Sequence, residues 1–181
     1  MNNEHIRAAL AQARAQGHRA RDAAESLGLS EGAALAAHTG LKDGPLCAMP
    51  LRPDWLKQLQ SLEACGTLMA LTRNDHVVHE KTGVYRQVSA SGPVGLALGE
   101  DIDLRLFFDR WHAGFAVTER GAHGGAPRSS LQYYDRHGTA VHKIYTREHT
   151  DVAAWQRVLD EAKEPLRQTA FVPKPEAPVR R

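Results

Sequence analysis

Two short segments of the chain contain the residues whose types could do chemistry. The segment "HVVHEKTG" contains His76 and His79, and the segment "DLRLFF" contains Arg105. Imidazole titrates near neutral pH and is the commonest protein ligand of metal ions, whereas a guanidinium pairs with carboxylates and other anions. The two histidines could therefore be ligands, acid–base groups, or polar residues on the solvent face of a sheet.

The spacing within each segment limits these roles. Side chains three positions apart in an extended strand point to opposite faces, so His76 and His79 are not expected to chelate one ion together. Arg105 lies between Leu104 and Leu106 and should face away from both. It could project into a second, functional face of the sheet and bind an anion there. The alternative is a solvated arginine at a sheet edge.

The rest of the sequence offers no other catalytic signature. Its ten histidines include no HExxH pair and no Cys–His zinc spacing, and the chain has no GxGxxG, Walker or GxSxG motif. Cys47 is predicted to lie in a Pro- and Gly-rich connector without an adjacent base, which argues against a thiol nucleophile. A structural zinc site and the common nucleotide-binding classes are therefore not expected.

Composition predicts one soluble domain of ordinary size. The chain has 181 residues, with 42% hydrophobic and 24% charged residues and a formal charge of +2. This charge creates no strong field for nucleic acid, and no apolar run reaches the roughly 18 residues of a membrane span. The charged N-terminus has no signal-peptide core. We therefore expect a cytoplasmic protein without a nucleic-acid partner or membrane insertion.

Helical periodicity appears at both ends of the chain. Residues 3–16 read as an amphipathic helix, and a second helix is expected over 31–37 with Ser30 as its cap. A short helix should start near Pro53. The last helix, in "TDVAAWQRVLDEAK", is expected to begin at Thr150 or Asp151. Its predicted core-facing residues are Val152, Trp155, Val158 and Leu159.

Between these helices the hydrophobic period changes to two. From Thr67 onward seven short apolar or alternating runs are separated by turn signals, which predicts an antiparallel meander of hairpins. The fold class is therefore α+β, with a large antiparallel sheet, N-terminal helices and a C-terminal helix. Residues 1–66 should form a helical segment packed on the sheet of 67–165 as one domain. Residues 166–181 should be a Pro-rich linker or tail.

The segment "ARDAAESLGLSEGAALAAH" has the helix–turn–helix pattern of some DNA-binding proteins. Its second helix, however, offers no Arg, Lys, Asn or Gln to contact base edges. A small packing unit against the rest of the domain is the preferred interpretation.

Several of these motifs together resemble a known family. The segments "LTRNDHVVHEKTGVY", "DLRLFFDRWHAGFAV", "SLQYYDRHGTAVHKIYT" and "TDVAAWQRVL" resemble the N-terminal repeat of HemS/ChuS-type haemin-degrading, or haemin transport, proteins. The resemblance runs from about residue 18 to 165 and implies a HemS/ChuX-like fold. It also implies an intracellular haem-binding protein of haem uptake, trafficking or degradation, and thus of iron acquisition.

The resemblance also implies roles for individual residues. His79 matches a histidine that contacts haem and is the candidate iron ligand, with His76 as a second candidate. Arg105 matches an arginine that lies against haem on the side away from an axial histidine. That axial histidine belongs to the second repeat of the family, which this sequence does not include. Haem is thus the expected cofactor, as ligand or substrate.

The sequence does not decide the activity or the partners. Haem-oxygenase-like degradation would need an external reductant, since the chain has no flavin or nicotinamide motif. The resemblance admits a haem importer, a haem oxygenase or a second copy of the chain as partner. The alternative function is an incomplete structural or dimerisation half-domain of a two-repeat haem protein, without independent activity.

Overall fold

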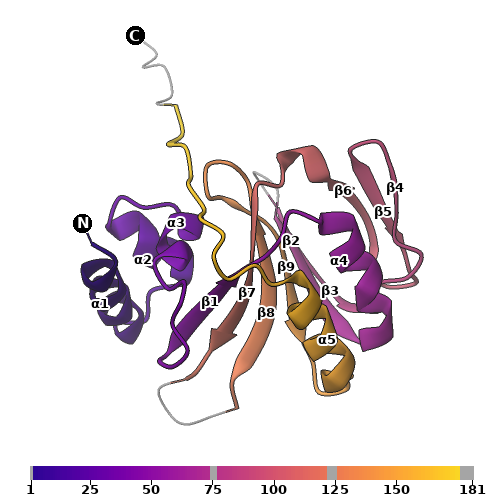
Figure 1. The fold of residues 1–181 in the computed structure, drawn as a ribbon, viewed down its shortest axis with the longest axis horizontal. Helices are drawn as coiled ribbons and strands as arrows, with labels where there is room; N and C mark the ends of the chain where they lie inside the picture. Colours follow the sequence, from indigo (N-terminus) through magenta and orange to yellow (C-terminus); the bar gives the residue numbers. More distant parts are fainter. Residues whose placement is uncertain (1, 74–76, 122–125, 176–181) are drawn as a thin grey trace.

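The computed structural model describes residues 2–73, 77–121 and 126–175. Two sheets and five α-helices make up this part of the chain (Figure 1). The helices are α1 (Asn3–Ala15), α2 (Ala20–Ser26), α3 (Glu31–Ala36), α4 (Trp55–Ser61) and α5 (Val152–Ala162). Two short 3-10 helices cover Leu62–Cys65 and Phe108–Arg110. None of the helices in these ranges is both long enough and apolar enough to cross a membrane.

Nine strands form the two sheets. They are β1 (Leu46–Pro50), β2 (Leu68–Arg73), β3 (Val78–Gly83), β4 (Ser89–Ser91), β5 (Val94–Leu98), β6 (Asp103–Phe107), β7 (Ala113–Glu119), β8 (Arg128–Tyr134) and β9 (Ala140–Thr146). The larger sheet has the order β1-β7-β8-β9-β2-β3 and the smaller one the order β4-β5-β6, with all pairs antiparallel.

The predicted α+β class is confirmed, and the meander is only part of the topology. Neighbours in sequence pair in β7-β8-β9 and in β4-β5-β6, as a meander of hairpins requires. The larger sheet is completed by two long-range pairings, of β1 with β7 and of β2 with β9. These pairings bring β3, the carrier of His79, to one edge of the larger sheet.

One sequence prediction is wrong in this region, because the segment around Cys47 is a strand. β1 pairs with β7 over the register Leu46–Glu119 to Pro50–Phe115. It is the outer strand of the sheet, and an edge strand tolerates the proline that suggested a connector.

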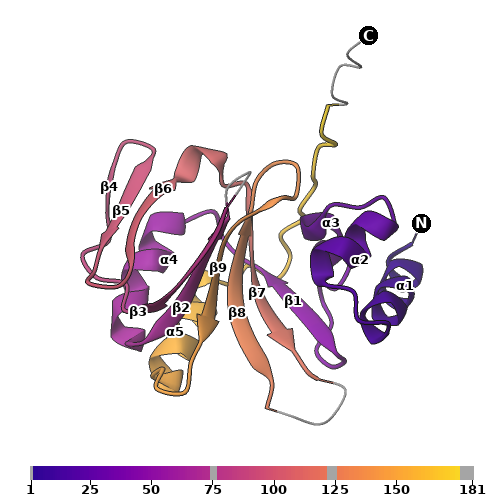
Figure 2. The same cartoon turned by 180° about the vertical axis from the view of Figure 1, so that it is seen from behind.

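The core lies between the larger sheet and helices α4 and α5, which cover one of its faces (Figures 1 and 2). Trp55 and Leu59 from α4 and Trp155 and Val158 from α5 pack there against Leu68, Tyr133 and Ile144 of the sheet. The inner side of the small sheet joins the same cluster through Leu106. The N-terminal helices gather beside β1, where Leu35 packs with Phe115 and Val117 on the opposite face.

Candidate functional site

Arg105 lies on the outer side of the small sheet. Leu106 on β6 is 3% exposed and Leu104 packs against the core, whereas Arg105 between them is exposed. The prediction that Arg105 faces away from both leucines is therefore confirmed, and it follows from the period of two along a strand. Within the described residues, no hydrogen bond or ion pair engages the Arg105 guanidinium.

Apolar side chains surround Arg105 on this side of the sheet. The β5–β6 register places Leu96 opposite Arg105, Val94 opposite Phe107 and Leu98 opposite Asp103. Leu98 is 50% and Phe107 47% exposed, and the guanidinium carbon of Arg110 lies 5.5 Å from the Phe107 ring centre. We call Val94, Leu96, Leu98, Arg105 and Phe107 the outer face. It is a largely apolar surface with a cation near its middle, and the exposed carboxylate of Asp103 lies at its end on the same side of β6.

His79 lies on β3, at the edge of the larger sheet. It is paired with Thr72 of β2, and all but the last of the β3 residues are exposed. The described part of the chain supplies no hydrogen-bond partner to its ring. An exposed imidazole without such a partner can still use a nitrogen lone pair to bind a metal.

His79 and Arg105 are on different sheets but in the same half of the molecule, away from α1–α3 (Figure 1). The two sheets meet where β3 ends, because a Cβ added to Gly83 would lie 2.8 Å from the Asp101 Cβ. No hydrogen bond joins the two predicted site residues. The third, His76, lies outside the described residues.

The histidines of the chain divide into two groups by the hydrogen bonds of their rings. Of the ten in the chain, His76 and His123 lie outside the described residues, which leaves eight. Four of these eight use a ring nitrogen in a hydrogen bond, namely His38, His112, His137 and His142. The others are His5, His18, His79 and His149, all exposed. Among these four, His79 is the one in a strand.

The buried His142 stabilises the fold and is not available as a metal ligand. Its Nδ1 lies 3.1 Å from the Thr72 Oγ1 and its Nε2 2.6 Å from the Tyr85 hydroxyl oxygen. Burial lowers the pKa of His142 to about 3 and raises the pKa of Tyr85 well above its usual value, so both groups are neutral at pH 7. With both nitrogens engaged, the ring cannot also bind a metal.

The sequence prediction missed the apolar residues of the outer face. Phe107 could have been found, because it shares the alternation of "DLRLFF" with Arg105. Leu96 and Leu98 come from the neighbouring strand, and their place beside Arg105 depends on a register that the segment alone does not give.

Comparison with known proteins places this fold and these segments in a family. The model of the haemin-degrading HemS.ChuX domain matches residues 28–162. The chain belongs to the HemS/ChuX family. The similarity covers β3, the outer face and α5, as the sequence resemblance implied.

Individual relatives agree with this assignment. The chain is 40% identical to the hemin transport protein HemS of Yersinia enterocolitica over 144 residues, which are 79% of this chain and 40% of that protein. It is 38% identical to the hemin transport protein HmuS of Yersinia pestis over 150 residues, or 82% and 41% of the two chains. The chain thus spans about two fifths of the length of these relatives.

Solved structures of heme-binding proteins are also similar to this chain. Holo-PhuS, a heme-binding protein from Pseudomonas aeruginosa, superposes with a TM-score of 0.84 and 40% identity, over 99% of this chain and 51% of that one. The heme-binding protein ChuX has a TM-score of 0.64 at 11% identity, over 80% of this chain and 91% of that chain. This second likeness supports the fold alone.

Proposed function

We propose that this chain binds haem on the outer face, as part of intracellular haem uptake, trafficking or degradation. The observation that carries this proposal is the cation of Arg105, which forms no ion pair with the described residues and lies within a half-exposed, largely apolar surface. A porphyrin presents the complementary chemistry, because its ring is apolar and its propionates are anionic. The relatives named as hemin transport and heme-binding proteins support this choice of ligand.

His79 is the proposed iron ligand of the chain. It is exposed at the sheet edge nearest the small sheet, and its ring is free of hydrogen bonds to the described residues. His79 would hold the iron, and bound haem would supply the redox chemistry of that iron. Haem degradation would also need an external reductant, so we rank binding above turnover.

The test is a haemin titration followed by absorbance at the Soret band. Haemin should bind the unaltered chain, His79→Ala should change the Soret band and weaken binding, and Arg105→Ala should weaken binding without altering the ligation spectrum. His149→Ala is the matched control, because His149 is an exposed histidine outside both sheets. Loss of the Soret band after adding ascorbate or peroxide would extend the proposal to degradation.

Three results would contradict this proposal. Spectrum and affinity unchanged by His79→Ala would remove His79 as ligand, and affinity unchanged by Arg105→Ala would remove the outer face. If the unaltered chain binds no haemin at all, the structural half-domain becomes the better description. The observation favouring that second candidate is that the chain spans about half of holo-PhuS.

A further inference from the structure

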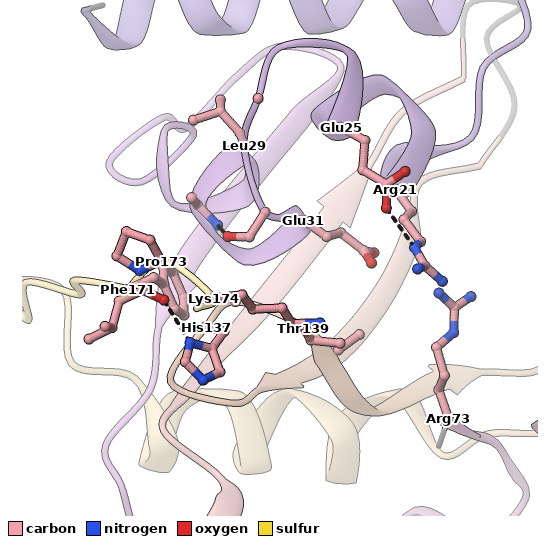
Figure 3. A pocket seen from close by; sticks show the side chains of 16 residues that line it. Arg21, Glu25, Leu29, Glu31, Arg73, His137, Thr139, Phe171, Pro173 and Lys174 are labelled. Carbon is pink, nitrogen blue, oxygen red and sulfur yellow. Dashed lines mark hydrogen bonds and ion pairs between the residues drawn. The ribbon is translucent and has the colours of Figure 1, made fainter. Parts of the chain in front are cut away.

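A pocket of about 430 Å³ lies away from the outer face, between the N-terminal helices and the end of β2 (Figure 3). Its walls come from the start of α2, the α2–α3 turn, the β8–β9 turn and residues 171–174. Neither Arg105 nor His79 lines it. The size falls within the roughly 300–1,000 Å³ typical of small-molecule sites.

The two carboxylates of the wall are already paired. Glu25 accepts a hydrogen bond from Arg21 at 3.0 Å, and Glu31 forms a part-buried ion pair with Lys143. Two cationic side chains of the wall, Arg73 and Lys174, take part in none of the ion pairs found in the described ranges. The pocket therefore carries positive charge that no ion pair among the described residues neutralises.

Arg73 has a second unusual feature. Its Nε is buried and has no hydrogen-bond partner, the one side-chain atom of this kind among the described residues. In Figure 3 its guanidinium points toward that of Arg21, at one side of the pocket. A buried donor without an acceptor is costly, and two facing guanidiniums repel each other. An anion between them would remove this repulsion and give the Arg73 guanidinium an acceptor.

The opposite wall is apolar and fixed in place. His137 accepts a hydrogen bond from Arg136 Nε at Nε2 (3.2 Å), and its Nδ1 lies 2.8 Å from the Val172 carbonyl oxygen, which assigns the proton to Nδ1. Phe171 packs against Tyr134 and His112. With both nitrogens in use, His137 holds the wall rather than a ligand. Leu29 and Phe171 then present hydrocarbon to the cavity.

We propose that this pocket binds a small amphipathic anion, with a carboxylate or phosphate group on an apolar body. Arg73 and Arg21 hold the anionic group between them, because guanidinium donors match the geometry of either group, and Lys174 adds positive charge from the opposite wall. The apolar body lies against Leu29 and Phe171. The site is independent of the haem-binding proposal, since it shares no residue with it.

The test is isothermal titration of the whole chain with benzoate, phenyl phosphate and benzamide, without haemin. We expect benzoate or phenyl phosphate to bind, and benzamide, which has the same ring and no charge, to bind at least about tenfold more weakly. Whichever anion binds more tightly identifies the headgroup. Arg73→Met should weaken that binding by at least about tenfold. The matched control is Arg157→Met, at an exposed arginine of α5.

Thermal melting and a second variant separate a binding role from a structural one. Arg73→Met removes an unpartnered buried nitrogen, so its melting temperature should equal or exceed that of the unaltered chain. Lys174→Gln, on an exposed segment, should weaken anion binding without changing folding. Failure of both anions to bind, equal binding of benzamide, or unchanged binding in both variants would overturn the proposal. Haemin titration of Arg73→Met should match the unaltered chain.

Discussion

The imidazole of His142 lies between aromatic rings in the core. The Trp111 ring stacks on it with 5.8 Å between centroids and 25° between planes, and Tyr85 meets it edge-on at 6.0 Å. The side chain is 1% exposed, so a proton on it would place a charge where no carboxylate is hydrogen-bonded to it. Folding therefore requires the neutral ring, and stability depends on pH through this residue.

We predict that acid destabilises the protein through His142. In the unfolded chain the histidine binds a proton below its ordinary pKa of 6.5, whereas the folded state does not until about pH 3. The unfolded state thus holds more protons in this window, so stability falls as pH falls below 6.5. The loss is about 1.4 kcal/mol per pH unit, or about 2 kcal/mol at pH 5. Urea unfolding at pH 7 and pH 5 measures it.

The variant His142→Gln cannot ionise and is the informative comparison. It should be less stable at pH 7 because it loses ring packing, yet its further loss at pH 5 should be smaller than that of the unaltered chain. His149→Gln, at an exposed site, should keep the full acid sensitivity. An equal drop in His142→Gln and in the unaltered chain would show that another group causes it, such as His38, whose pKa burial also lowers.

Arg105 and His142 show which side-chain positions could be predicted from the sequence and which could not. The alternation of "DLRLFF" correctly oriented Arg105, because a strand with one buried face fixes the direction of every side chain along it. Nothing in "TAVHKIYT" distinguished His142 from a solvated histidine. Its partners Thr72 and Tyr85 are 70 and 57 residues away and meet it only after β2 pairs with β9.

At the scale of elements, the predictions failed where tertiary pairing overrides local sequence. A connector is predicted around Cys47 because the segment is rich in Pro and Gly, yet each residue of β1 pairs with a residue of β7. In α5 the predicted buried residues Trp155 and Val158 are buried, but Val152 is 73% exposed. Val152 is the first residue of the helix, and the helical pattern alone misplaces it.

β7 crosses α4 at a glycine, and we predict that a methyl group there is destabilising. A Cβ at Gly114 would lie 2.9 Å from the Trp55 ring and 3.0 Å from the Tyr133 ring. Both rings are packed in the core and cannot move freely, so Gly114→Ala should cost about 1–3 kcal/mol of unfolding free energy. Chemical denaturation monitored by circular dichroism measures this loss.

Gly121→Ala is the control for that substitution. Among the described residues nothing lies within 4 Å of a Cβ added at Gly121, and the backbone there needs no left-handed conformation. Its effect should stay within about 0.5 kcal/mol. Equal stabilities of the two variants would mean that α4 adjusts its distance from β7 without cost.

At the scale of the whole molecule, the outer face is open on one side. Small-molecule sites usually bury about 70–90% of their ligand, whereas a single sheet surface can cover only one side of a porphyrin. We therefore predict that haemin brings two copies of this chain together, each covering one side of the ring. Analytical ultracentrifugation with and without haemin should show a larger sedimentation coefficient and haemin absorbance in the faster species.

The substitution Phe107→Ser tests the same arrangement. It removes a 47% exposed ring from the outer face and should reduce haemin-dependent association while leaving the haemin-free chain folded. A chain that binds haemin fully and still sediments as a monomer would contradict the two-copy arrangement.

The tryptophans of the core give the molecule an optical property of its own. All three in the chain, Trp55, Trp111 and Trp155, are buried in one cluster, and the inner side of the small sheet packs on that cluster. Shielded indoles emit at short wavelength, and haem absorbs in that region. A porphyrin on the outer face would therefore quench the emission by energy transfer through the thickness of a single sheet. Haem binding would therefore lower the tryptophan fluorescence of the protein, and no attached label would be needed to follow it.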